Sequence, residues 1–108
     1  MSDGILQWSF TLGIMASPKA TLDCVDAFSR TDFRSDFASF TIRTLVIHGT
    51  NDKTVLIGPS SRTAAAGIVV ARLIEYEGEP HGLLATAPDR LNRHPLDFLA
   101  EVVRSKFL

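Results

Sequence analysis

The sequence has almost no cysteine and no excess of positive charge. Cys24 is the single cysteine in 108 residues, which excludes an internal disulfide framework and a cysteine-rich zinc site. Lysine and arginine total 11 against 12 aspartate and glutamate residues, so the basic face of a nucleic-acid-binding protein is not expected. The composition therefore argues against nucleic acid as a partner.

Long hydrophobic runs are missing as well. The apolar stretch at residues 5–16 is interrupted by polar residues and is too short to cross a membrane. Asp3 is the only charge before this stretch, so a signal peptide with a positive leader is not expected. These features predict a cytoplasmic protein that does not associate with membranes.

The remaining composition is that of a folded protein. Hydrophobic residues make up 45% of the chain, charged residues 21%, and the formal net charge is −1, a balance that argues against disorder. A chain of 108 residues is long enough for one small domain with a modest core.

Residues 1–40 are expected to form an N-terminal helical segment. The apolar residues of 1–16 fit both a strand and a helix, so their spacing leaves the choice open. Ser17 and Pro18 are typical of an N-cap and a first helical position, and they predict a helix over 18–29. A single helical turn is expected at 32–36.

Residues 41–108 have the pattern of a βαβα unit with two parallel strands. The β-branched run 44–49, stopped by glycine, predicts a buried strand, and 69–76 predicts a second. A helix is expected between them, from Pro59 onward, and another from Pro88. Two buried-type strands with both outer edges open make an unfinished sheet, which suggests a larger assembly or a second copy.

The loops after the two strands contain the best candidates for chemistry. Asp52 follows the first strand and His81 follows the second, and the carboxyl ends of parallel strands share one edge of a sheet. We therefore expect the two side chains to lie within reach of each other. A carboxylate beside an imidazole holds one tautomer of the ring and stabilises its protonated form.

Two segments around these residues, TLVIHGTNDKTV (44–55) and YEGEPHGL (76–83), resemble the C-terminal part of an α/β-hydrolase of the cofactor-free haloperoxidase and arylesterase type. The segments LGIMAS (12–17) and TDFR (31–34) resemble the end of the helical cap in the same family. The resemblance covers about residues 4–100. It implies a partial α/β-hydrolase fold, with residues 1–40 derived from the cap and 41–108 from the hydrolase domain.

The resemblance implies that Asp52 is the acid and His81 the base of a catalytic triad. In this family a serine on a G-x-S-x-G turn attacks an ester, perhydrolysis by peroxide is a side activity, and no cofactor or metal is required. Only Ser60 has a glycine two residues earlier, and Arg62 stands where the second glycine is required. The chain therefore resembles a truncated hydrolase without its nucleophile.

Two interpretations follow from this resemblance. In the first, the chain belongs to an enzyme that hydrolyses small carboxylic esters: either it is one fragment of that enzyme, or a second chain supplies the serine and the oxyanion hole. The isolated chain is then inactive. In the second, the chain is a non-catalytic remnant that associates with itself, most simply as a homodimer.

Several other residues have structural interpretations. Cys24 is expected to be buried and inert, and His48 to be structural. Core packing is preferred for three large apolar residues over the alternative that they line an acyl pocket: Trp8, Phe10 and Met15. His94 is expected at the surface, and Pro95 is expected to kink or break the last helix.

Overall fold

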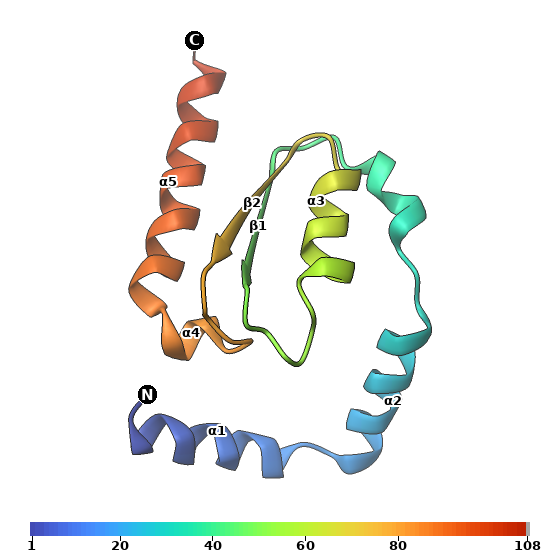
Figure 1. Cartoon of the computed structure of the whole chain (residues 1–108), viewed down its shortest axis with the longest axis vertical. Helices are drawn as coiled ribbons and strands as arrows, with labels where there is room; N and C mark the ends of the chain where they lie inside the picture. The colour runs from blue at the N-terminus through green and yellow to red at the C-terminus, as the bar shows by residue number, and fades with distance from the viewer. Residues whose placement is uncertain (108) are drawn as a thin grey trace. The chain divides into compact units, whose positions relative to one another are not determined.

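The computed structural model describes residues 1–107, which divide into two compact units, residues 1–33 and the chain from residue 34 onward (Figure 1). Residues 34–40 group with the second unit, whereas the sequence pattern placed them in the helical segment. No helix among the described residues has both the length and the apolar character needed to cross a membrane.

The first unit consists of two helices, α1 (Asp3–Met15) and α2 (Pro18–Arg30). The choice left open for residues 1–16 is resolved as a helix, and the hydroxyl of Ser2 caps it by accepting from the amide of Ile5. The predicted start of α2 is confirmed, because Ser17 caps it and Pro18 occupies its first turn.

Neither helix of the first unit contains a buried residue. The apolar residues of α1 recur at spacing two, and a helix distributes such a pattern around its whole circumference instead of on one face. The expectation of core packing is wrong for Trp8, Phe10 and Met15, which are 55%, 65% and 76% exposed. Burial is also wrong for Cys24, whose side chain is exposed on α2.

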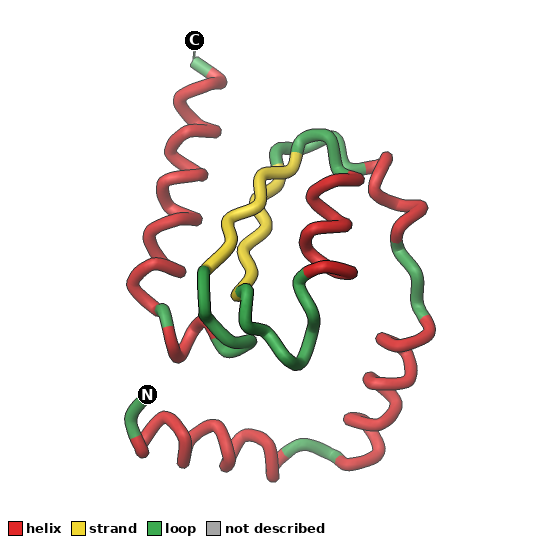
Figure 2. The backbone as a smooth tube through the Cα atoms, in the orientation of Figure 1, coloured by secondary structure: helices red, strands yellow, loops and turns green. Residues whose placement is uncertain are grey.

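The second unit is the predicted α/β part. Figure 2 shows its two strands side by side, with helical segments before, between and after them. Its elements in chain order are η1 (Arg34–Ser39), β1 (Thr44–Gly49), η2 (Gly58–Arg62), α3 (Thr63–Gly67), β2 (Ala71–Tyr76), α4 (Leu83–Thr86) and α5 (Pro88–Lys106). The fold class, an α/β unit with two parallel strands, is confirmed.

Some helices and strands begin at other residues than the sequence predicts. The second strand begins at Ala71 instead of residue 69, because the Ala71 amide donates to the carbonyl of Ile68 and closes a turn that leaves Val69 97% exposed. The expected turn at 32–36 is the 3₁₀ helix η1. The helix expected from Pro59 begins as the π-helical turn η2.

The strands pair in parallel, with Thr44 opposite Ala71 and Gly49 opposite Tyr76. Side chains alternate between the two faces of a strand. On one face, Arg72 bonds to Glu101 of α5. On the other face, His48 and Glu75 bond to residues of η2, so helices cover both faces of the sheet.

Helix α5 continues through Pro95 as one element of 19 residues, so the predicted break does not occur. Pro95 removes only its own amide from the helix, and the neighbouring turns are anchored on the sheet. The imidazole Nδ1 of His94 lies 2.6 Å from the hydroxyl of Tyr76, which is 1% exposed. The surface position expected for His94 is therefore wrong, because the ring is half-buried and hydrogen-bonded.

The end of β1 tolerates no side chain. A Cβ atom added to Gly49 would lie 2.2 Å from the carbonyl oxygen of Glu79, whereas one added to Gly58 would meet nothing within 4 Å. Because the obstacle is backbone, we expect Gly49→Ala to destabilise the fold by about 3 kcal/mol, the upper end of the usual overpacking cost. Gly58→Ala should change stability by less than about 1 kcal/mol.

Urea unfolding followed by circular dichroism measures both variants. Equal unfolding midpoints for Gly49→Ala and Gly58→Ala would contradict this account of the strand end.

Candidate active site

The site is built where the two parallel strands end. The loop after β1 and the loop after β2 lie at one edge of the sheet, and backbone bonds join them directly. The amide of Thr50 donates to Tyr76 over 2.9 Å, and the amide of Asn51 donates to Glu79 over 3.0 Å. The strand register is therefore continued into the loops.

A turn in the second loop completes the connection. The amide of Gly78 donates to the hydroxyl of Thr50 over 2.8 Å, and its φ of +74° is a conformation that side-chain-bearing residues rarely adopt. This turn precedes His81 and directs the chain back over the end of β1.

Asp52 is the most enclosed charged residue of the site, at 4% exposed. Its Oδ1 accepts from the amides of Thr54 and Val55 over 2.9 and 2.8 Å. Burial by itself raises the pKa of the carboxyl group, but the hydrogen bonds from Val55, His81 and Thr54 outweigh it and lower the pKa from 3.8 to about 2. The group is ionised at neutral pH.

His81 lies against this carboxylate with one ring nitrogen. Its Nδ1 is 2.7 Å from Oδ2 of Asp52, and 57% of its side chain is exposed. Since an ionised carboxylate only accepts, the hydrogen-bond network assigns a proton to Nδ1. In the neutral ring the second nitrogen, Nε2, is then unprotonated and can accept a proton.

A second imidazole shares the same carboxylate oxygen. The Nε2 of His48 lies 3.0 Å from Oδ2 of Asp52 and 2.9 Å from the carbonyl oxygen of Val55. A hollow of about 110 Å³ surrounds the group and is lined by Ile47, His48, Gly49, Asp52, His81 and Leu83.

No serine of the described residues lines the hollow beside Asp52 and His81. Ser60 donates its hydroxyl to the carbonyl of Leu56, and the Ser61 hydroxyl is bonded to Nδ1 of His48 and not to His81. Within residues 1–107 no group of three or more histidine, cysteine, aspartate or glutamate residues has an arrangement that could hold a metal ion.

The arrangement can perform one kind of chemistry. A buried carboxylate that orients an imidazole makes that ring a general base and then a general acid for a group placed against its outer nitrogen. Asp52 and His81 form such a pair, and the second unit presents it at the carboxyl edge of a parallel sheet, where α/β enzymes bind ligands.

No protein-family model matches the chain, but individual proteins do. It is 36% identical to a non-heme chloroperoxidase of Streptomyces lividans over 99 residues, which are 92% of this chain and 36% of that protein. It is 33% identical to the bifunctional esterase/perhydrolase DCH of Acinetobacter calcoaceticus over 95 residues, 88% of this chain and 34% of that one. A solved bromoperoxidase from Bacillus anthracis matches with a TM-score of 0.87 and 40% identity, covering 93% of this chain and 36% of the bromoperoxidase.

These similarities and the parallel βαβα unit define the chain as a partial α/β-hydrolase. It is similar to non-heme haloperoxidases, and the match fits the C-terminal part of their fold. The chain spans about 36% of the length of the chloroperoxidase it matches.

The contact expected between Asp52 and His81 is present. Two contributions escaped the sequence analysis: the hydroxyl of Thr50, which joins the loops, and the contact of His48 with Asp52. For the Thr50 contact, the only indication in the sequence is that a hydroxyl residue directly follows the glycine that ends the strand. The second has no signal in the sequence, because a residue at a strand end reaches a loop residue only through the local turn.

The depressed pKa of Asp52 predicts acid sensitivity. As the pH falls, the unfolded chain takes up a proton near 3.8 but the folded chain does so only near 2, so the unfolded state binds more protons between these values. The stability that Asp52 contributes is therefore present above about pH 4 and is lost as the pH falls through about 2.

Urea unfolding midpoints at pH 5, 4, 3 and 2 measure this. Between pH 4 and 2 we expect the midpoint to fall more steeply for the wild type than for Asp52→Asn. The control Asp97→Asn also removes a carboxylate, but an exposed one on α5, and should follow the wild type. Parallel curves for wild type and Asp52→Asn would refute the assignment.

Proposed function

We propose that the chain supplies the acid and base of a serine esterase whose nucleophile lies on a second polypeptide. Asp52 orients His81, and His81 is the proton-transfer residue. The substrates are small carboxylic esters, with perhydrolysis by peroxide as a side reaction, and neither step requires a cofactor. The observation that carries the proposal is the 2.7 Å contact between Asp52 Oδ2 and His81 Nδ1 at the carboxyl edge of the sheet.

The proposed reaction uses the outer nitrogen of His81. That nitrogen takes the proton of the partner's serine hydroxyl as the serine oxygen attacks the ester carbonyl, and Asp52 stabilises the imidazolium that forms. The proton then passes to the alcohol as the carbon–oxygen bond breaks and leaves an acyl-serine. Water or peroxide, deprotonated by the same nitrogen, then attacks the acyl carbonyl; as the bond to the serine oxygen breaks, that oxygen takes the proton back from His81, and the acid or peracid is released.

The sequence has no G-x-S-x-G turn, and the matched proteins are about two and a half times as long as this chain, so the proposed serine lies outside these 108 residues. Both strands have one edge without a partner strand in the described residues. One of the relatives carries the name esterase/perhydrolase, and others are named chloroperoxidases.

The proposed place of action is the cytoplasm, because a single exposed free cysteine fits a reducing compartment.

Complementation tests this function. The chain is co-expressed with the portion of the Bacillus anthracis bromoperoxidase that it does not cover, and the purified mixture is assayed with p-nitrophenyl acetate and a serine-directed fluorophosphonate. Activity should appear only in the mixture, with the label on the bromoperoxidase portion. Asp52→Asn should lower kcat by about 10⁴-fold, the factor typical of a triad aspartate.

The chain alone is the control and should show no turnover above its own His81→Ala variant. Labelling of a serine in this chain, or a mixture whose turnover is unchanged in His81→Ala, would refute the proposal.

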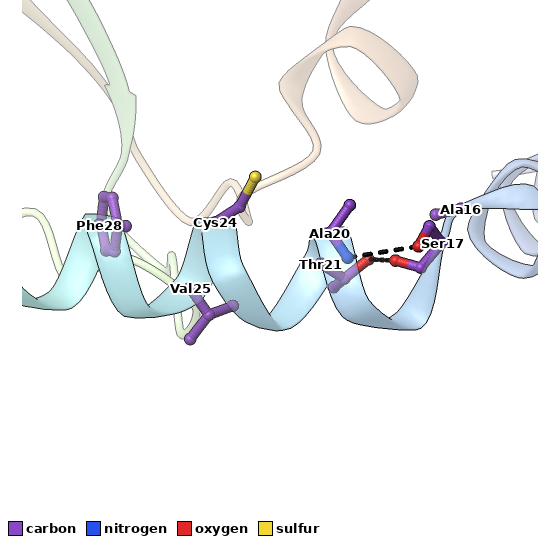
Figure 3. A pocket seen from close by; sticks show the side chains of 7 residues that line it. All are labelled: Ala16, Ser17, Ala20, Thr21, Cys24, Val25 and Phe28. Carbon is purple, nitrogen blue, oxygen red and sulfur yellow. Dashed lines mark hydrogen bonds between the residues drawn. The ribbon is translucent and has the colours of Figure 1, made fainter.

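A second candidate function is that of a non-catalytic remnant that associates with itself, as a homodimer. Helix α2 and the two residues before it favour this candidate, because their side chains line an open hollow of about 460 Å³ (Figure 3). The hollow is lined by Ala16, Ser17, Ala20, Thr21, Cys24, Val25 and Phe28. Exposed apolar surface of this kind is typical of an interface.

Sedimentation velocity over a range of concentrations separates the two candidates. If the chain alone is a dimer through α2, Val25→Lys should shift it to a monomer, since a charge at a desolvated contact is costly. Gln7→Lys, on the exposed helix α1, adds the same charge and should leave the dimer intact. A wild type that remains monomeric at the highest concentration would eliminate this second candidate.

A further inference from the structure

We propose that His48 is a positioning residue for the Asp52–His81 pair. Its ring lies beneath the turn that presents the carboxylate, with only 11% of its side chain exposed. One nitrogen faces that turn, and the other faces η2. His48 thereby connects the loop of the site to the helical layer on the sheet.

The protonation of the ring follows from its partners. A carbonyl oxygen only accepts, so Nε2 must donate to the carbonyl of Val55, which is 2.9 Å away. Nδ1 lies 2.6 Å from the hydroxyl of Ser61, which can donate to it. The network therefore assigns the proton to Nε2, the nitrogen that also faces Oδ2 of Asp52 at 3.0 Å.

The Nε2–H of His48 donates to the carbonyl at one end of the turn and lies 3.0 Å from the carboxylate oxygen at the other. The amide of Val55 is bound by Oδ1 of Asp52, and its carbonyl is bound by His48, so the residue is held on both sides. Oδ2 faces His48 and His81 together. The direction in which Oδ2 meets the His81 ring is therefore set by His48 as well as by the backbone amides.

The charges around His48 come from three directions. Glu75 lies opposite it in the strand register and is held by two bonds from Arg62 of η2, at 2.8 and 2.7 Å. Asp52 faces it from the loop, and His81 lies beyond the shared oxygen. Because Arg62 pairs with Glu75, the carboxylate left to His48 is that of Asp52.

The catalytic value of this positioning rests on the proposed function, whereas the positioning itself can be measured in the 108-residue chain. Two substitutions form a matched pair. The side-chain amide of His48→Gln reaches the position of Nε2, whereas that of His48→Asn reaches only the position of Nδ1. Both remove the ring from the same partly buried site, so they share its packing cost.

Nitrogen-15 NMR of the histidine rings gives the first readout. In the wild type we expect the proton of His48 on Nε2 and that of His81 on Nδ1. In His48→Asn the Nδ1 proton of His81 should exchange with water about tenfold faster, because the Val55 carbonyl loses its hydrogen-bond donor and the turn that carries Asp52 is held less firmly. His48→Gln should restore slow exchange, and the His94 signal should not move in either variant.

Ser61→Ala gives a second variant that leaves the ring and its packing in place. Without its hydroxyl partner the His48 ring loses its preferred tautomer, and exchange at His81 should accelerate by a smaller factor. Equal exchange at His81 in wild type, His48→Asn and Ser61→Ala, or a wild-type His48 with its proton on Nδ1, would overturn the inference.

The complemented enzyme separates this inference from the function on which it rests. There His48→Asn should lower kcat about tenfold with little change in KM, and His48→Gln should retain most of the activity. Turnover that is identical in both variants would overturn the positioning role. If no mixture is active but the NMR result holds, the proposed function fails and the positioning role stands.

Discussion

The carboxylate of Asp52 is the interaction point on which the site depends. It is nearly enclosed, and its two oxygens receive hydrogen bonds from two backbone amides and from His81, with His48 also in reach. A buried carboxylate is costly unless its oxygens are satisfied, so the loop must adopt a conformation that supplies these donors. The same donors keep the group ionised, which is the state that orients an imidazole.

The same requirement explains how Asp52 and His81 are held together in a small α/β unit. The register of β1 and β2, the bonds between their loops and the close approach at Gly49 are local properties of two adjacent strands. All of these contacts are made between the two strands and the loops that follow them. The carboxylate and the imidazole are therefore brought together by β1, β2 and their loops.

The first unit contrasts with this arrangement. Serine side chains cap the start of both helices, yet neither helix buries a residue. Helix α1 distributes its apolar side chains on all sides, and α2 with the two residues before it exposes a hollow of apolar and small residues (Figure 3). Local propensity and capping thus determine these helices, whereas burial of their apolar surface requires a partner surface.

Much of the fold could be predicted from particular residues. Ser17 and Pro18 indicated the start of α2, and the run closed by Gly49 indicated β1, because caps, proline and β-branched runs act through local geometry. The side chains in the helices were predicted less well. Hydrophobicity alone predicts a core position for Cys24 and Trp8, which are exposed, because burial depends on what packs against a helix and not on the residue type.

By itself, the sequence determined the α/β class, the family resemblance and the neighbouring positions of Asp52 and His81, because strand order in a parallel unit follows from short-range patterns. Only the tertiary structure decided the shared carboxylate oxygen, the enclosure of His48, the contact of His94 with Tyr76 and the continuity of α5 through Pro95. These features depend on distances between segments far apart in the chain or on competing hydrogen bonds, and no local pattern encodes either.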